Sequence, residues 1–186
     1  MDPDRVVLIG ESLGGYFAPR AAAFEHRLAA LIADPGNPDP GAIALSRLPI
    51  RLRTLERLPA RVRDVLFAAA SRDPMAAWVL RRGMWTHGAD SPLAYLRAVV
   101  AYRMGAKAAQ ITCPTLVCWA EDDSLGARAR QLFDALTCRK AFVEFHSAEG
   151  AGDHCESGAR SLFDQRVFDW PDTVLAEVGA STPVNT

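Results

Sequence analysis

The stretch VVLIGESLGGYF, residues 6–17, combines a short apolar run with a serine that stands among glycines. The run has no polar interruption up to Ile9, which predicts a strand over residues 5–9 that is buried on both faces, as in a parallel sheet. Apolar residues then recur at helical spacing and predict a helix over residues 13–25. Ser12 therefore falls in a sharp turn between a strand and a helix.

Gly10, Ser12 and Gly14 fit the pattern GxSxG, which gains specificity from this strand–turn–helix context. A serine on such a turn holds strained backbone angles, and small neighbours avoid collision with the adjoining strand and helix. The Leu13 N–H lies at the positive end of the helix, where it can donate to a developing oxyanion. We therefore predict Ser12 as a nucleophile and Leu13 as an oxyanion donor.

A serine nucleophile needs a histidine base that an acid orients, and in this arrangement the acid precedes the histidine along the chain. The run TLVCWA, residues 115–120, predicts a strand, and Glu121, Asp122 and Asp123 follow its carboxyl end, where α/β sheets place their sites. Asp123 is the best single candidate for the acid. Asp122 and Asp123 could instead cap the helix that follows.

The candidate base is His154, which ends the small-residue loop SAEGAGDH after a predicted strand over residues 141–145. The plainer interpretation of His26 and His146 is that they are surface or packing residues. The four cysteines match no zinc pattern, because neither CxxC nor a paired HxxxH is present, and they are expected to be free thiols. Among them only Cys155, next to His154, has a candidate site role.

Strands and helices are expected to alternate on both sides of a long insertion. The expected strands are 5–9, 28–33, 115–120 and 141–145, and the expected helices are 13–25, 127–136 and a last one from about residue 156. This alternation predicts a parallel sheet with right-handed crossovers, and hence a three-layer α/β architecture.

The insertion is predicted to be all helical and spans residues 37–110, so that residues 1–36 and 111–180 form the α/β core. It opens with PGNPDPG, which cannot continue a helix or strand, and continues with amphipathic helical patterns. Most of its large apolar residues are expected to be ordinary core. Trp85 and His87 are candidates for lining a ligand cavity.

Composition excludes several function classes. The 186 residues are 49% hydrophobic and 23% charged, which is typical of a globular protein. The net charge is -1 from 21 basic and 22 acidic residues that are interleaved and form no long block of one sign, so we expect no nucleic-acid or membrane partner. The start MDPDR is acidic and polar and is not expected to act as a signal peptide, so the expected location is the cytoplasm. No motif for a metal or other cofactor is present.

Three segments together carry a family resemblance: GESLGGYFAPRAAAFEHRLAA, ITCPTLVCWAEDD and EGAGDHCESGARSLFDQRVFDW. In their order the chain resembles the α/β-hydrolase fold family, in the branch of cap-bearing serine hydrolases similar to prolyl-oligopeptidase-like esterases and 2,6-dihydroxypseudooxynicotine hydrolase. The resemblance implies Ser12 as nucleophile, Asp123 as acid, His154 as base and residues 37–110 as a helical cap. It favours Asp123 because the family acid lies three residues after the small residue that ends its strand, here Ala120.

The resemblance covers only the C-terminal half of the family fold. Family members have further strands and a second oxyanion donor before the elbow, so the strand over residues 5–9 is expected to expose an apolar edge here. We therefore expect an excised part of a longer protein, a misjudged start of translation, or a chain whose edge is covered by a partner or a second copy. Pro171 is expected to kink the last helix or restart it near Trp170.

These residues predict a cofactor-free serine hydrolase. It would act on an ester, an amide or a carbon–carbon bond next to a carbonyl in a small molecule, through a covalent acyl-enzyme. The alternative, from another class, is a noncatalytic hydrolase-fold fragment that acts as a binding module or survives as a remnant. The complete set of nucleophile, base and acid favours the first interpretation, and the absent oxyanion loop favours the second.

Overall fold

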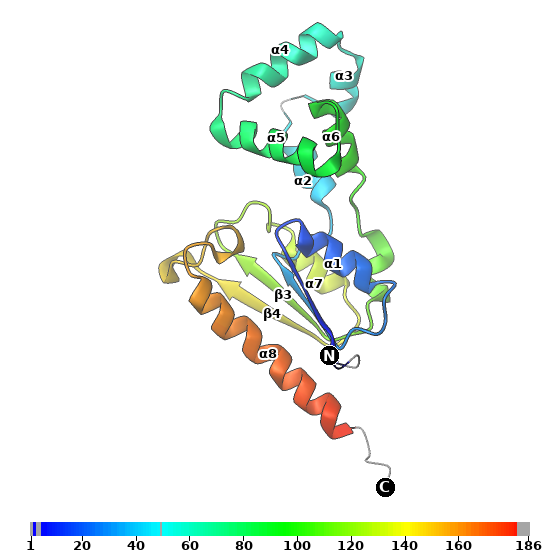
Figure 1. Ribbon diagram of the computed structural model, residues 1–186, viewed down its shortest axis with the longest axis vertical. Coiled ribbons are helices and arrows are strands. Elements are labelled where there is room, and N and C mark those ends of the chain that lie inside the picture. Colours follow the sequence, from blue (N-terminus) through cyan, green and yellow to red (C-terminus); the bar gives the residue numbers. More distant parts are fainter. Residues whose placement is uncertain (1, 3–4, 49, 182–186) are drawn as a thin grey trace. The chain divides into compact units, whose positions relative to one another are not determined.

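The computed structural model describes residues 2, 5–48 and 50–181, which divide into two compact units (Figure 1). The α/β unit consists of Met1–Asp39 together with Met104–Thr186, and the helical unit is Pro40–Arg103. The strands and main helices of the α/β unit are β1 Val7–Glu11, α1 Gly14–Ala22, β2 Ala30–Asp34, β3 Thr115–Ala120, α7 Ala129–Ala135, β4 Lys140–Phe145 and α8 Arg160–Ser181.

The four strands form one parallel sheet in the order β1-β2-β3-β4. Because the strands are parallel, their carboxyl ends lie at the same end of the sheet, and the register places Glu11 beside Asp34 there. β1 is an edge strand, and Ile9 within it is 37% exposed. Polar side chains at the carboxyl ends of the strands therefore lie together at one end of the sheet, next to the turn after β1.

The two faces of the sheet are covered by different helices, because side chains alternate along each strand. Ile32, Leu116 and Cys118 point to the face on which Phe163 and Val167 of α8 pack. The neighbouring positions serve the other face, where α1 packs on β1 and β2 and α7 packs on β3 and β4. The predicted three-layer α/β fold is confirmed.

The described residues of the helical unit form five helices: α2 Pro40–Ser46, α3 Leu52–Arg57, α4 Ala60–Ala70, α5 Pro74–His87 and α6 Pro92–Val100. Asp73 and Ser91 start α5 and α6 by accepting hydrogen bonds from backbone N–H groups three residues later, at 2.7 and 3.2 Å. A small apolar cluster around Leu55, Leu93 and Leu96 forms its core. The unit is shorter than the predicted insertion, because the 3-10 helix η2, Gly105–Gln110, belongs to the α/β unit.

The last helix differs from the expectation. Pro171 lies inside α8, which continues through it to Ser181, so of the two expected outcomes the restart near Trp170 was wrong and the kink stays a prediction. Phe163, Val167 and Val174 are buried on both sides of the proline. This packing offsets the cost of about 3 kcal/mol for an interior proline.

Charge is divided unevenly between the two units. The helical unit has eleven arginines and four acidic residues, whereas the α/β unit has ten basic and eighteen acidic residues. The near balance of the whole chain therefore conceals a basic helical unit and an acidic α/β unit. No helix among the described residues combines the length and apolarity needed to cross a bilayer.

Candidate active site

Ser12 occupies the turn between β1 and α1 with φ 57, a left-handed conformation that is unfavourable for a residue with a side chain. Two hydrogen bonds hold the turn. The Ser12 N–H donates to the Asp34 carbonyl oxygen at 2.7 Å, and the Gly15 N–H donates to the Ser12 carbonyl oxygen at 2.9 Å. The turn thus has the strained backbone that the sequence predicted for Ser12.

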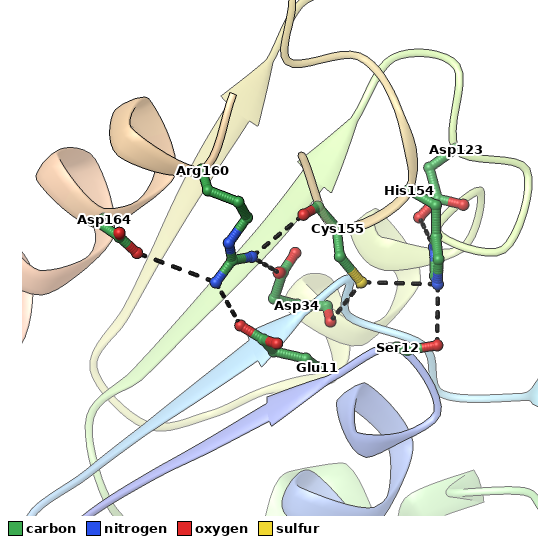
Figure 2. A network of polar contacts seen from close by, with 8 residues as sticks. All are labelled: Glu11, Ser12, Asp34, Asp123, His154, Cys155, Arg160 and Asp164. Atoms are coloured by element: carbon green, nitrogen blue, oxygen red, sulfur yellow. Dashed lines mark hydrogen bonds and ion pairs between the residues drawn. The ribbon is translucent and has the colours of Figure 1, made fainter. Parts of the chain in front are cut away.

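His154 connects Ser12 to Asp123 (Figure 2). Its Nε2 lies 2.9 Å from Ser12 Oγ, and its Nδ1 lies 2.8 Å from Asp123 Oδ2. The Asp123 side chain is only 2% exposed, and its other oxygen accepts a hydrogen bond from the Leu125 N–H at 2.8 Å. The structure therefore brings together a hydroxyl, an imidazole and a fixed carboxylate in the geometry of a nucleophile, a base and its orienting acid.

The other two acids after β3 point elsewhere. Asp122 accepts a short hydrogen bond from the Ser147 hydroxyl. Glu121 accepts a hydrogen bond from the Ser147 N–H at 2.9 Å and lies 3.6 Å from His146 Nδ1. Of the three neighbouring acids, it is Asp123 that faces His154.

Leu13 is the N-terminal cap of α1, so its N–H belongs to the first turn of that helix. No acceptor for this N–H is found among the described residues. An unpaired N–H at a helix N-terminus, directly after the serine, is a suitable donor to an oxyanion formed on the carbonyl that the serine attacks.

Trp85 and His87 belong to α5 of the helical unit rather than to the unit that contains Ser12. Trp85 is 78% exposed. The His87 ring packs against Tyr95 and Tyr102, with ring centroids 5.1 and 5.8 Å away, and its Nδ1 lies 2.8 Å from the Gly83 carbonyl oxygen. His87 therefore has a packing role within its own unit, and a substrate contact by either residue remains a prediction.

Sequence reasoning missed a second cluster of polar side chains beside the triad, which consists of Asp34, Glu156 and Arg160. Asp34 ends β2, and Glu156 ends the 3-10 helix η4, His154–Glu156. Arg160 of α8 donates to Glu11 at 2.6 Å and to the Cys155 carbonyl oxygen at 3.1 Å, as Figure 2 shows. Asp34 could have been found by the rule that selected Asp123, since both follow the end of a buried parallel strand.

Burial is the main cause of the raised pKa values of the two acids in this second cluster, Asp34 and Glu156. It raises the pKa of Asp34 to about 7 and that of Glu156 to about 9, and the Asp34 charge adds to the shift of Glu156. Burial likewise raises the pKa of the Cys155 thiol to about 12. Its sulfur lies 3.6 Å from His154 Nε2, so Cys155 is a protonated neighbour of the imidazole rather than a competing thiolate.

Within residues 5–48 and 50–181, no group of three or more histidine, cysteine, aspartate or glutamate side chains is placed to hold a metal ion. The Ser12, His154 and Asp123 side chains are instead hydrogen-bonded to one another. They do not converge on a common centre in the way that metal ligands do.

Comparison with known proteins identifies the family and the fold of the chain. A family model described as "Alpha/beta hydrolase family" matches residues 1–166. The chain belongs to the alpha/beta hydrolase family. Among solved structures, proline iminopeptidase from Mycobacterium smegmatis superposes with a TM-score of 0.62 at 18% identity, covering 94% of this chain and 67% of the other. The 2,6-dihydroxy-pseudo-oxynicotine hydrolase superposes with a TM-score of 0.56 at 20% identity, covering 94% and 40%.

Two curated relatives of this chain come from fungi. The 20-hydroxy-prefusarin hydrolase FUS2 of Gibberella moniliformis is 30% identical over 95% of this chain and 45% of its own length. Hydrolase acrC of Aspergillus aculeatus is 29% identical over 92% of this chain and 42% of its own length. The chain therefore spans a little less than half the length of these relatives.

Proposed function

We propose that the chain carries the nucleophile, base and acid of a serine hydrolase. The observation that supports this most is the continuous path from Ser12 Oγ through the His154 imidazole to Asp123, with steps of 2.9 and 2.8 Å. The left-handed φ of Ser12 and its place between a strand and a helix N-terminus add to it, because they match the strained elbow of α/β-hydrolases.

In the proposed reaction, the Ser12 oxygen attacks a carbonyl carbon while His154 Nε2 accepts the hydroxyl proton. Asp123 holds the proton of His154 Nδ1 and so keeps the imidazole in the required tautomer. The Leu13 N–H donates to the oxyanion that forms. His154 then protonates the leaving group, and water, activated by the same imidazole, hydrolyses the acyl group on Ser12.

The proposed substrate is a small molecule with an ester, an amide or a carbon–carbon bond next to a carbonyl. The name of the fungal relative FUS2 refers to a small organic molecule, 20-hydroxy-prefusarin, which favours this substrate class over a polymer. Substrate contacts by Trp85 and His87, and a cytoplasmic location, stay predictions. A noncatalytic binding module is the alternative function.

Labelling with a fluorophosphonate probe separates the two functions. We expect one covalent adduct on Ser12 that disappears in Ser12→Ala and forms much more slowly in His154→Gln. Ser147→Ala is the matched control, because this hydroxyl bonds to Asp122 and not to the imidazole. Folded chain, verified by circular dichroism, that acquires no Ser12 adduct would overturn the hydrolase proposal and favour the binding module.

A further inference from the structure

Two buried acids next to the proposed triad have no conventional partners. The Asp34 and Glu156 side chains are both 0% exposed. None of their four carboxyl oxygens has a hydrogen-bond partner among the described residues. Because an isolated buried carboxylate is very unfavourable, a carboxyl group in such a place takes up a proton instead.

The two carboxyl groups interact with each other, and burial raises the pKa of both. A single proton placed between them turns one carboxyl into a donor and leaves the other as an acceptor. This arrangement supplies the missing hydrogen bond without a third residue. It also avoids two adjacent negative charges in a buried site.

Other charged or titratable groups around the pair come from every element packed against it. They are Glu11 on β1, Cys118 on β3, Asp123 after β3, His154 and Cys155 on η4, and Arg160 on α8. Arg160 is the nearby cation, but its Nη1 lies 4.0 Å from Asp34 Oδ2, while its hydrogen bonds go to Glu11 and to the Cys155 carbonyl oxygen. The positive charge of Arg160 therefore lowers the pKa values of Asp34 and Glu156, but burial still keeps them raised.

Asp34 also joins the two segments that carry the proposed nucleophile and base. Its carbonyl oxygen accepts from the Ser12 N–H at 2.7 Å and from the Cys155 thiol at 3.7 Å, while its side chain meets Glu156. Cys155 and Glu156 have φ 51 and 46, a left-handed conformation that residues with side chains avoid. The surroundings must hold η4 in this shape, and the contacts with Asp34 connect η4 to the backbone of the turn that carries Ser12.

We propose that Asp34 and Glu156 are positioning residues that share one proton and thereby hold His154 beside Ser12. This inference rests on the proposed function in so far as His154 is the base. Since the raised pKa values lie above those of ordinary carboxyl groups, the stabilisation by this proton is complete in acid and is lost as the pH rises through the neutral and alkaline range. Once the proton leaves, the two carboxylates repel each other and η4 moves with Glu156.

The test is the pH dependence of fluorophosphonate labelling in the 186-residue chain. We expect the wild-type rate to decline on the alkaline side. Glu156→Gln should remove that decline, because its amide N–H donates to Asp34 at every pH, whereas Glu156→Ala should label about 10- to 100-fold more slowly throughout. Glu144→Gln is the control, since Glu144 is an exposed partner of Arg130 at 3.0 Å, and its profile should equal that of wild type. An unchanged alkaline decline in Glu156→Gln would overturn the proposal.

A second measurement keeps this inference separate from the hydrolase proposal. At neutral pH, the infrared spectrum of the Ser12→Ala chain should contain the carbonyl band of a neutral carboxyl group. This band should be missing when Glu156→Gln is added to the same chain. If this band is present while no variant labels at any pH, the hydrolase proposal fails and the shared proton stands. If the band is absent from folded protein, the shared proton is refuted whatever the labelling shows.

Discussion

Alanine at Gly10 is expected to destabilise the chain far more than alanine at Gly14, although both glycines belong to the GxSxG pattern. A Cβ at Gly10 would lie 2.6 Å from the Ala18 Cβ and 2.6 Å from the Gly14 carbonyl carbon, and closer still to the Gly14 carbonyl oxygen. Ordinary contacts between carbon atoms are about 3.5–4.0 Å, so β1 and α1 would have to separate by roughly 1 Å. None of these neighbours can move aside by rotating a side chain.

Overpacking of a dense core costs about 1–3 kcal/mol, and contact with backbone atoms places Gly10→Ala at about 3 kcal/mol. No atom lies within 4 Å of a Cβ at Gly14, the first residue of α1. Gly14→Ala should therefore gain about 0.4–1 kcal/mol through a less flexible unfolded chain.

Urea unfolding followed by tryptophan fluorescence measures both effects. For a slope of about 2 kcal/mol per molar urea, the midpoint should fall by about 1.5 M in Gly10→Ala and rise by a few tenths of a molar unit in Gly14→Ala. Equal midpoints in the two variants would refute the argument that Gly10 is required by the close packing of β1 on α1.

Three further predictions address the acid, the core and the edge of the sheet. Asp123→Asn should slow fluorophosphonate labelling about 10⁴-fold, because an asparagine favours the wrong imidazole tautomer. Asp122→Asn should change the rate much less, and equal losses would contradict the assignment of the acid. Phe163→Ala should lower the free energy of unfolding by about 3–5 kcal/mol, because the ring is fully buried between α8 and the sheet. Phe168→Ala, at a position that is 47% exposed on the same helix, should cost about 1 kcal/mol or less in the same denaturation assay, and similar losses would contradict the packing of α8. Ile9→Lys should reduce self-association in size-exclusion chromatography, because a charge on an edge strand opposes strand pairing, and an unchanged apparent mass would argue against pairing through this edge.

The strands could be predicted from local sequence, because a continuous run of four to six apolar residues is typical of a strand that is buried on both faces of a parallel sheet. β3 has the predicted bounds, Thr115–Ala120. β1 was expected over residues 5–9 and is found at Val7–Glu11, because the hydrogen-bonded ladder continues to the pair of Glu11 and Asp34. A ladder follows the backbone, and the polar side chains at its end do not stop it.

The last helix and the histidine loop were harder to predict. The helical pattern was expected to start near Glu156, but η4 and a short turn precede α8, which begins at Arg160. A kink or a restart of the helix near Trp170 was expected from the intrinsic cost of Pro171. Burial of the helix face on both sides of Pro171 outweighs that cost, and burial by a distant sheet is not written in the local sequence.

The sequence by itself determined the strand, elbow and helix around Ser12, and the order in which the acid and the histidine follow. These features depend on short-range patterns of apolar residues and glycines. Only the tertiary structure decided that Asp123, and not its neighbour Asp122, meets His154, and that Asp34 and Glu156 are both buried and interact with each other. Those outcomes depend on which segments, distant along the chain, meet at the carboxyl edge of the sheet, and on how completely they exclude water there.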